Sequence, residues 1–342
     1  MGVNAVGAVP IVLAADGGGS KTDVLAIDLD GVVVAHERGR GGNPQVIGWP
    51  PVREELNRLR AAVLAAAGDR PLLLQHVYQA GLDLPEELAT AAVQLADWTD
   101  RAPLLAENDL FALLRAGTAA KDAIAVVCGT GINAIGVRAD GATARFPALG
   151  EVSGDWGGGA GIGTAALWHA IRAEDGRGPE TSLRGVVAGA FGAGSVREVV
   201  EALHFGRLPA TAVNDLTPLL FVEAEAGDAV AGAVVGRQAE EIVLMADVLL
   251  RRLGLQDAAV PVVLGGSVLA AQEPRLVAAV VGGLAERAPT AHAVWVSDPP
   301  IVGAALLALE AAGAAPGALE TAAREVVAAI GIGRAEERAW RS

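Results

Sequence analysis

One pattern occurs twice in this sequence, and no other feature constrains the fold as much. In the first copy, an apolar strand at residues 11–14 leads through a glycine-rich loop to a strand at 24–29, an Asp-Gly turn and a strand at 32–36. The same order returns at residues 124–146. An Asp-Gly pair between apolar runs is typical of a tight β-hairpin. The sequence therefore predicts two similar domains, each opening with a three-stranded meander.

Strand and helix patterns alternate around these two copies. Helical patterns are found at about 51–67 and 85–95, and a third helix is predicted to start at residue 109. Further strands are predicted at residues 72–78, 104–107, 260–264 and 293–296. Such alternation is typical of the α/β class. We expect an N-terminal domain at 9–118, with a helical segment at 318–337 packing back on it, and a C-terminal domain at 119–317.

The charge and the cysteine content exclude several classes of protein. The 342 residues carry a formal net charge of −14 without a run of Lys and Arg, so no nucleic-acid partner is expected. Hydrophobic residues make up 52% of the chain, but their uninterrupted runs are shorter than the roughly 18 residues that cross a membrane. The single cysteine, Cys128, rules out an internal disulfide and a paired-cysteine metal or redox site.

The N-terminal apolar stretch at residues 6–15 does not have the pattern of a secretion signal. No basic segment precedes it, and Pro10 interrupts it. Because no run in the sequence is long enough to span a membrane either, we expect a cytoplasmic protein without a membrane partner.

The glycine loop of the first copy has the composition of a phosphate-binding loop. Without Cβ atoms, Gly17, Gly18 and Gly19 let backbone N–H groups converge on one point, and they also permit positive φ angles. Three further residues complete this candidate phosphate site: Ser20, Lys21 and Thr22. Asp16, at the end of the strand, could hold Mg²⁺ directly or through water. The run is equally compatible with a plain tight turn, because glycine runs are weak motifs.

Two well-known nucleotide motifs are absent, and two other glycine loops take their place. Neither the Walker A pattern nor the dinucleotide-binding glycine pattern occurs in the chain. At the position of the first glycine loop, the second copy has Gly129, Thr130 and Gly131, so two loops could bind one triphosphate. A third loop follows a predicted buried strand and consists of Gly265, Gly266 and Ser267. The glycines of this third loop would let an adenine ring lie against the backbone.

Asp109 is the candidate catalytic base. It stands where a predicted strand ends and a predicted helix begins. A carboxylate there could accept the proton of an acceptor hydroxyl during phosphoryl transfer. An aspartate at this position could also simply cap the helix. The residues by themselves leave both roles open.

Together, the three glycine loops resemble the two phosphate motifs and the adenosine motif of the superfamily that unites actin, sugar kinases and heat-shock chaperone ATPases. The likeness runs from about residue 11 to residue 310. Within this superfamily, the sequence is most similar to N-acetylglucosamine kinases and the BadF/BadG/BcrA/BcrD family. The resemblance implies an α/β, two-lobed, actin-like ATPase fold of the ribonuclease H-like type, with a duplicated β-meander plus helices in each lobe.

The resemblance also assigns residues to a sugar acceptor. Asn43 corresponds to the asparagine that contacts the sugar, and Asn108 and Asp109 to the segment whose aspartate activates the acceptor hydroxyl. Residues 149–158 resemble the substrate loop of the family, and its candidate sugar contacts are Glu151, Ser153, Asp155 and Trp156. This loop is one residue shorter than the family pattern, with Asp155 in place of an aromatic residue, and Ile132 replaces the usual Ser after the second glycine loop. These departures bear on the identity of the sugar.

By this resemblance, the chain is a homodimeric, ATP- and Mg²⁺-dependent kinase that phosphorylates an aminosugar such as N-acetylglucosamine at its 6-hydroxyl. Two alternatives share the fold: an ATPase activator of electron-transfer enzymes and a nucleotide-dependent sensor without a sugar acceptor. The activators hold an iron–sulfur cluster with two cysteines from each of two subunits, and Cys128 alone cannot supply these. The sensor alternative stays open.

Overall fold

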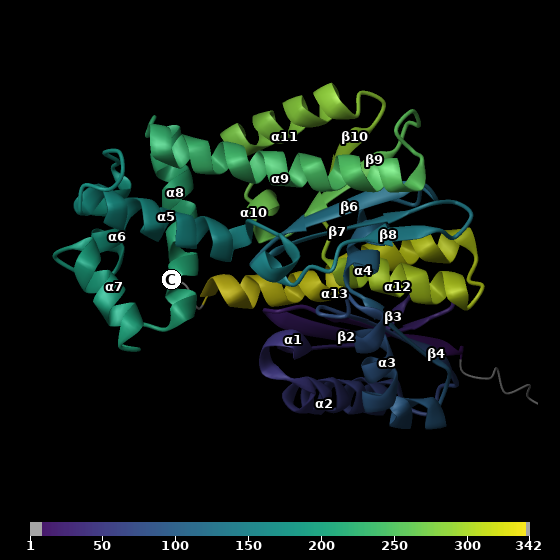
Figure 1. Ribbon diagram of the computed structural model, residues 1–342. Coiled ribbons are helices and arrows are strands. Elements are labelled where there is room, and N and C mark those ends of the chain that lie inside the picture. The colour runs from purple at the N-terminus through teal and green to yellow at the C-terminus, as the bar shows by residue number, and fades with distance from the viewer. Residues whose placement is uncertain (1–8, 340–342) are drawn as a thin grey trace, which may run out of the picture. The chain divides into compact units, whose positions relative to one another are not determined.

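The computed structural model describes residues 9–339, and the chain divides into two compact units. Unit 1 contains the chain up to Ala119 and again from Val296, and unit 2 is Ala120–Trp295. Residues 1–8 and 340–342 lie outside the described residues. The apolar N-terminal stretch, which does not have the pattern of a secretion signal, begins within residues 1–8. Figure 1 colours the described elements in chain order.

Unit 1 is built on a mixed sheet with the strand order β3-β2-β1-β4-β5. Its strands are β1 (Ile11–Gly17), β2 (Lys21–Asp28), β3 (Val33–Arg40), β4 (Leu72–Gln79) and β5 (Leu104–Asn108). β1 is antiparallel to β2 and parallel to β4, and β5 is parallel to β4. The carboxyl ends of β1, β4 and β5 therefore share one edge of the sheet, which is where ligands bind in open α/β sheets.

Helices cover both faces of this sheet. They are α1 (Pro44–Ile47), α2 (Trp49–Ala67), α3 (Pro85–Gln94), α4 (Leu110–Gly117), α12 (Pro300–Ala311) and α13 (Pro316–Ala339). Along β1, Ile11, Leu13 and Ala15 join the core beneath α2, whereas Val12 and Ala14 join the core beneath α12 and α13. Side chains alternate along a strand, so a strand buried on both faces is expected to be apolar, as β1 is from Ile11 to Ala15.

The place of α12 differs from the expected domain boundary. α12 packs on α4 and β1 so closely that a Cβ atom on Gly303 would collide with the carbonyl oxygen of Ala112. The chain returns to unit 1 at Val296, so that residues 296–317 are grouped with the N-terminal segment rather than with unit 2. Because α12 is apolar around nearly its whole circumference, its sequence does not indicate which of the two sheets it covers.

Unit 2 repeats the connectivity of unit 1 strand for strand. Its sheet has the order β10-β9-β6-β7-β8. The strands are β6 (Ala123–Cys128), β7 (Ile132–Val137), β8 (Thr143–Arg145), β9 (Pro261–Gly265) and β10 (His292–Trp295). As β1 does in unit 1, β6 pairs antiparallel with the next strand and parallel with a later one, β9. The α/β class and the duplicated meander are thus confirmed.

The helices of unit 2 form a helical extension and a layer on the sheet. They are α5 (Gly158–Glu174), α6 (Leu183–Ala190), α7 (Val196–His204), α8 (Leu216–Glu225), α9 (Ala229–Leu253), α10 (Ser267–Ala270) and α11 (Pro274–Arg287). The long helix α9 packs on β6, β7 and β8 and also contacts α5 and α8 (Figure 1). In the part of the chain that the structure describes, no helix has the length and apolar character that crossing a membrane requires.

Candidate active site

The first glycine loop joins β1 to β2 at the ligand-binding edge of the unit 1 sheet. The N–H of Gly18 donates to the carbonyl of Lys21 at 2.9 Å and closes the hairpin. A Cβ atom on Gly19 would meet no atom within 4 Å, and one on Gly18 would meet only the Lys21 carbonyl, at 3.4 Å. Neither glycine has a positive φ, so conformational freedom is not what requires them. Glycine here keeps the space above the loop open, as a bound phosphate would need.

A second loop of unit 1, at residues 41–43, is fastened to this phosphate loop. The N–H of Gly42 donates to the Gly18 carbonyl at 3.0 Å. Gln79, at the end of β4 and fully buried, donates through Nε2 to the carbonyls of Gly17 at 2.9 Å and Gly42 at 2.7 Å. Asn43 follows directly, and its Oδ1 accepts the N–H of Gln45 as the N-cap of α1. The candidate sugar residue Asn43 is therefore placed beside the candidate phosphate loop.

The other polar residues of the first loop lie along β2. Lys21 is half exposed, with its Nζ 4.0 Å from Asp23 Oδ2. The carboxylate of Asp23 is buried and also contacts Arg38 Nε and His36 Nε2, each at 2.8 Å. Thr22 is buried, and Ser20 lines a shallow surface hollow with Lys21. Lys21 thus stands next to the phosphate loop with its charge only weakly engaged.

Asp16 is a buried carboxylate at the end of β1. In the part of the chain that the structure describes, it forms no hydrogen bond or ion pair through its side chain. Burial, followed by the nearby carboxylates of Asp109 and Asp23, raises the pKa of Asp16 well above its ordinary value. A cation would relieve this cost, and Mg²⁺ commonly takes only one or two protein carboxylates and completes its shell with phosphate and water. Asp16 therefore fits a Mg²⁺ ligand, although among residues 9–339 no group of three or more His, Cys, Asp or Glu side chains is arranged to hold a metal ion by itself.

Asp109 lies at the junction of β5 and α4. Its environment distinguishes between the two roles that the sequence left open, a catalytic base and a helix cap. Its side chain makes no capping hydrogen bond. Asn108 caps the helix instead, since its Oδ1 accepts the N–H of Leu110 at 3.0 Å. Burial, followed by the carboxylate of Asp83, raises the pKa of Asp109 from 3.8 to about 7. A carboxylate with a pKa near neutrality is suited to general base catalysis.

Asp83 is a residue of this region that the sequence analysis missed. It is buried, and its Oδ1 accepts from Asn108 Nδ2 at 2.9 Å while its Oδ2 accepts from Gln45 Nε2 at 3.1 Å. Both polar ends of the Asn108 side chain are thereby engaged within the chain, which favours a positioning role for Asn108. Asp83 follows the end of β4 by four residues. The signal that could have found it is the one that found Asp16 and Asp109, an aspartate just after a buried parallel strand.

In unit 2, the second and third glycine loops lie against each other. The N–H of Gly129 donates to the Gly131 carbonyl at 2.9 Å, and a Cβ atom on Gly131 would meet nothing within 4 Å. Gly266, in contrast, has a φ of +94°, and a Cβ atom there would lie 2.5 Å from the carbonyl of Cys128. Thus Gly131 keeps space open, whereas Gly266 permits the turn between β9 and α10 to pack on the second loop. Ser267 also lies beside Gly129.

The N-terminus of α5 is attached to the second glycine loop. The N–H of Gly159 donates to the Gly129 carbonyl at 2.7 Å, and that of Ala160 to the Thr130 carbonyl at 2.9 Å. Gln238 of α9 accepts the N–H of Gly158 at 2.9 Å. These first N–H groups of the helix are consequently occupied by the protein itself, and the helix fixes the position of Thr130.

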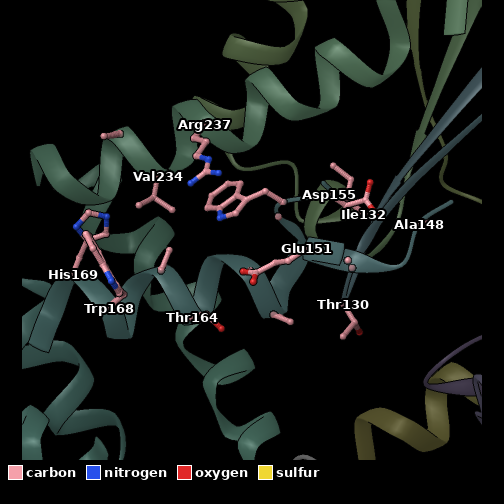
Figure 2. Close-up of a pocket in the computed structure, with 18 residues that line it drawn as sticks. Thr130, Ile132, Ala148, Glu151, Asp155, Thr164, Trp168, His169, Val234 and Arg237 are labelled. Carbon is pink, nitrogen blue, oxygen red and sulfur yellow. The ribbon is translucent and has the colours of Figure 1, made fainter. Parts of the chain in front are cut away.

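The residues expected to contact the sugar in unit 2 precede α5, and all but Ser153 border a cavity of about 710 Å³. Figure 2 shows Glu151 and Asp155 at this cavity, together with Thr130. Trp156 also lines the cavity. Asp155 is buried, and its Oδ2 lies 2.5 Å from Ser153 Oγ. Ser153 is not among the cavity-lining residues, and its hydroxyl fixes the loop instead. Glu151 is exposed and free to contact a ligand.

Comparison with known proteins identifies the family. Residues 15–308 match the BadF/BadG/BcrA/BcrD ATPase family along most of the chain. The chain belongs to this family. It is 24% identical to an N-acetyl-D-glucosamine kinase of Dictyostelium discoideum over 318 residues, which cover 87% of this chain and 98% of that protein. It is 25% identical to an N-acetylmuramic acid/N-acetylglucosamine kinase of Clostridium acetobutylicum over 264 residues, which cover 75% of this chain and 85% of that protein.

A solved structure of similar fold supports the assignment at the level of architecture. A candidate N-acetylglucosamine kinase of Chromobacterium violaceum superposes with a TM-score of 0.65 at 22% identity, covering 87% of this chain and 99% of that one. The expected actin-like ATPase fold is confirmed for this member of the BadF/BadG/BcrA/BcrD family. Membership also makes ATP the expected nucleotide.

Proposed function

We propose that this protein is an ATP-dependent kinase that phosphorylates a hydroxyl of an aminosugar such as N-acetylglucosamine, at its 6-position. The observation that carries the proposal is the environment of Asp109, whose pKa is raised to about 7 and whose side chain is not used to cap α4. The names of the two curated relatives support the substrate class, because both are kinases of N-acetylated aminosugars.

In the proposed reaction, Asp109 accepts the proton of the sugar hydroxyl as the γ-phosphoryl group of ATP is transferred to that oxygen. Phosphoryl transfer needs mainly positioning and charge stabilisation, so a base of near-neutral pKa is sufficient. Asp83 and Asn108 would act as positioning residues for Asp109. Asn43 would offer its Nδ2 group to a sugar hydroxyl, since its Oδ1 is engaged with Gln45.

The nucleotide is assigned to the glycine loops. In unit 1, the open space at Gly18 and Gly19 would accommodate phosphate oxygens, with Lys21 nearby. In unit 2, Gly131 offers the same open space, and residues 265–267 would contact the nucleoside. Mg²⁺ held by Asp16 would neutralise charge on the phosphates when bound.

The acceptor contacts in unit 2 are assigned to the loop before α5. Glu151 and Asp155 would accept hydrogen bonds from sugar hydroxyls, and the Trp156 indole would pack on a sugar face. The guanidinium of Arg237 lies 3.9 Å from the ring centre of Trp156, and the indole also packs partly against the core of unit 2, so a ligand would meet only its remaining exposed part.

The iron–sulfur activator alternative is disfavoured by Cys128. This thiol is fully buried, and burial raises its pKa to about 12. A cluster ligand must be a thiolate. A buried, protonated cysteine behind the second glycine loop cannot serve that role, which supports the kinase.

The experiment that tests the proposal is a coupled assay of ADP release with a panel of sugars: N-acetylglucosamine, glucosamine, N-acetylmuramic acid, N-acetylmannosamine and glucose. We expect ADP release to depend on an aminosugar and on Asp109. ADP release at the same rate with and without every sugar would favour the sensor or ATPase alternative and reject the kinase.

A further inference from the structure

The cavity of unit 2 is larger than the contacts of one sugar ring explain. It extends from Thr130 and the loop before α5 along the groove formed by α5 and α9, and it reaches Trp168 and His169 (Figure 2). From Gly161 to Trp168, both of which line it, α5 advances seven residues, or roughly 10 Å at the usual helical rise. A volume of about 710 Å³ lies in the upper half of the range of roughly 300–1,000 Å³ that is usual for small-molecule pockets.

The two ends of this cavity differ in chemistry. At the near end, Thr130, Glu151 and Asp155 offer polar atoms suited to hydroxyl groups. At the far end, the wall is formed by the apolar side chains of Trp168, Val234 and Ala233, with His169 beside Trp168. The side chain of Trp168 remains 51% exposed, although an indole of this size is usually well covered. A ligand that fills the whole cavity would therefore carry hydroxyls at one end and an apolar face at the other.

Both indoles of the cavity are held in place by arginines. The guanidinium of Arg172 lies 4.5 Å from the ring centre of Trp168, as that of Arg237 lies 3.9 Å from that of Trp156. His169 meets Trp168 edge to face at 4.6 Å. Cation–π contacts of this kind contribute about 0.5–1 kcal/mol at exposed sites and so favour one orientation of the ring. The exposed part of the Trp168 indole is available to pack against a flat ligand ring.

The nucleoside of ATP does not account for the far end. In the sheet order β10-β9-β6-β7-β8, the turn after β9 lies on one side of β6, and the β7–β8 hairpin lies on the other. The cavity borders the loop that follows β8, and none of residues 265–267 lines it. The cavity thus borders the acceptor residues and Thr130 and Gly131 of the second glycine loop, where the phosphates are assigned, but not the adenosine motif.

We propose that the acceptor is an aminosugar that carries a second ring, a disaccharide or an aryl glycoside, and that Trp168 is the specificity residue for this second ring. The inference rests on the proposed kinase function. The phosphorylated sugar would lie at Thr130, Glu151 and Asp155, and the second ring would lie in the groove of α5 and α9 with its face on Trp168.

The test compares kcat/KM for N-acetylglucosamine, its β-1,4-linked disaccharide and its phenyl β-glycoside in the coupled ADP assay. We expect the better of the two-ring acceptors to exceed the monosaccharide by roughly 10- to 100-fold, as expected for one added apolar group in a fitted pocket. Comparing the disaccharide with the aryl glycoside shows whether the second ring is a sugar or an aromatic ring. Trp168→Ala should reduce that ratio to near one, and Ala233→Phe, which fills the far end, should do the same.

Phe205→Ala is the matched control, because Phe205 is a large aromatic side chain with 66% exposure and its own arginine, Arg207, at 5.3 Å, yet it does not line the cavity. The control should keep the wild-type ratio. A monosaccharide used as well as either two-ring acceptor, or a ratio unchanged in both Trp168→Ala and Ala233→Phe, would overturn the inference while leaving the kinase intact. If no sugar in either form is phosphorylated, the proposed function itself is rejected, and the inference with it.

Discussion

Asn108 Nδ2 donates to the carboxylate Oδ1 of Asp83 at 2.9 Å, and this bond holds a negative charge close to the candidate base. Asn108 also caps α4 through its Oδ1. The residue before Asp109 thereby fixes both the start of the helix and the position of Asp83. Because Asp83 contributes to the raised pKa of Asp109, this pair sets the pH at which the base becomes ionised.

The first prediction concerns that pH. Asp109 must be ionised to accept a proton, so kcat/KM should rise with pH and reach half its maximum near pH 7. Asp83→Asn removes the second largest cause of the raised pKa and leaves burial, the largest. The midpoint should therefore move to lower pH without returning to 3.8, the ordinary value. The measurement is the pH profile of kcat/KM for both proteins.

Asp69→Asn is the control for the pH profile, because Asp69 is an exposed aspartate of unit 1 that follows α2. It should leave the midpoint unchanged. A midpoint that is the same in wild type and Asp83→Asn would show that Asp83 does not act on the catalytic base.

The second prediction concerns Asp109 itself. Asp109→Asn should lower kcat by roughly 10²- to 10⁴-fold, the usual range for a lost general base, with the affinity for ATP nearly unchanged. Steady-state kinetics and direct titration with ATP measure the two quantities separately. Normal turnover by this variant would reject the assignment of Asp109.

The third prediction is that the same substitution stabilises the protein. The pKa of Asp109 is about 7 when folded and 3.8 ordinarily, so the folded state resists losing this proton. The contribution of Asp109 to the stability of the folded state is therefore greatest below pH 4, and it is lost as the pH rises through about 7. Asp109→Asn removes that penalty, worth on the order of 1–4 kcal/mol above pH 7. Chemical denaturation at pH 5 and pH 8 should show an advantage for Asn that grows with pH, and a constant difference would contradict the shifted pKa.

The duplicated meander could be predicted from sequence because its signals are local. Turn residues at fixed positions and apolar runs of strand length define each hairpin, and the two Asp-Gly turns fall where the structure has them. Asp16 and Asp109 could be chosen for the same reason, as Asp16 lies at the end of a strand and Asp109 directly follows one. The roles assigned to these residues remain predictions.

What sequence could not provide is contact between distant segments. Gln79 and Asp83 take their importance from loops far away in the chain, and a buried glutamine in a strand has no local signature. The different roles of the glycines also became apparent only from the structure. Gly131 faces open space, whereas Gly266 faces the backbone of Cys128, although both stand in similar glycine turns.

The fourth prediction uses this difference between Gly131 and Gly266. Gly131→Ala adds a Cβ atom that meets nothing in the protein, so folding should be unaffected while the affinity for ATP falls. Gly266→Ala places a Cβ atom 2.5 Å from the Cys128 carbonyl at a φ of +94° and should lower stability by roughly 1–3 kcal/mol. Thermal unfolding without ligand and titration with ATP distinguish the two effects. Loss of stability in Gly131→Ala, or unchanged ATP affinity, would argue against the open phosphate site.

The last prediction concerns Gln79, which connects the phosphate loop to the loop of Asn43. Its Nε2 donates to the carbonyls of Gly17 and Gly42, and its side chain is fully buried. Gln79→Leu would leave the Gly42 carbonyl without this donor, at a cost of about 1–3 kcal/mol for a buried group that stays unpaired, whereas the Gly17 carbonyl would still accept the N–H of Ala80 at 2.8 Å. The two loops would then lose the side-chain link between them and keep the backbone bond from the Gly42 N–H to the Gly18 carbonyl. Because one loop is assigned to ATP and the other to the sugar, KM for both substrates should rise together in this variant.

Gln75→Leu is the matched control, since Gln75 is also a fully buried glutamine of β4. Its Nε2 donates to the carbonyls of Trp98 at 2.8 Å and Ala102 at 3.1 Å, away from both loops. Both variants should lose stability, but at a temperature where both remain folded only Gln79→Leu should show raised KM values. Equal KM values in the two variants would mean that Gln79 supports the fold without positioning the substrate loops. A rise in KM for ATP alone would mean that the loop of Asn43 does not bind the sugar.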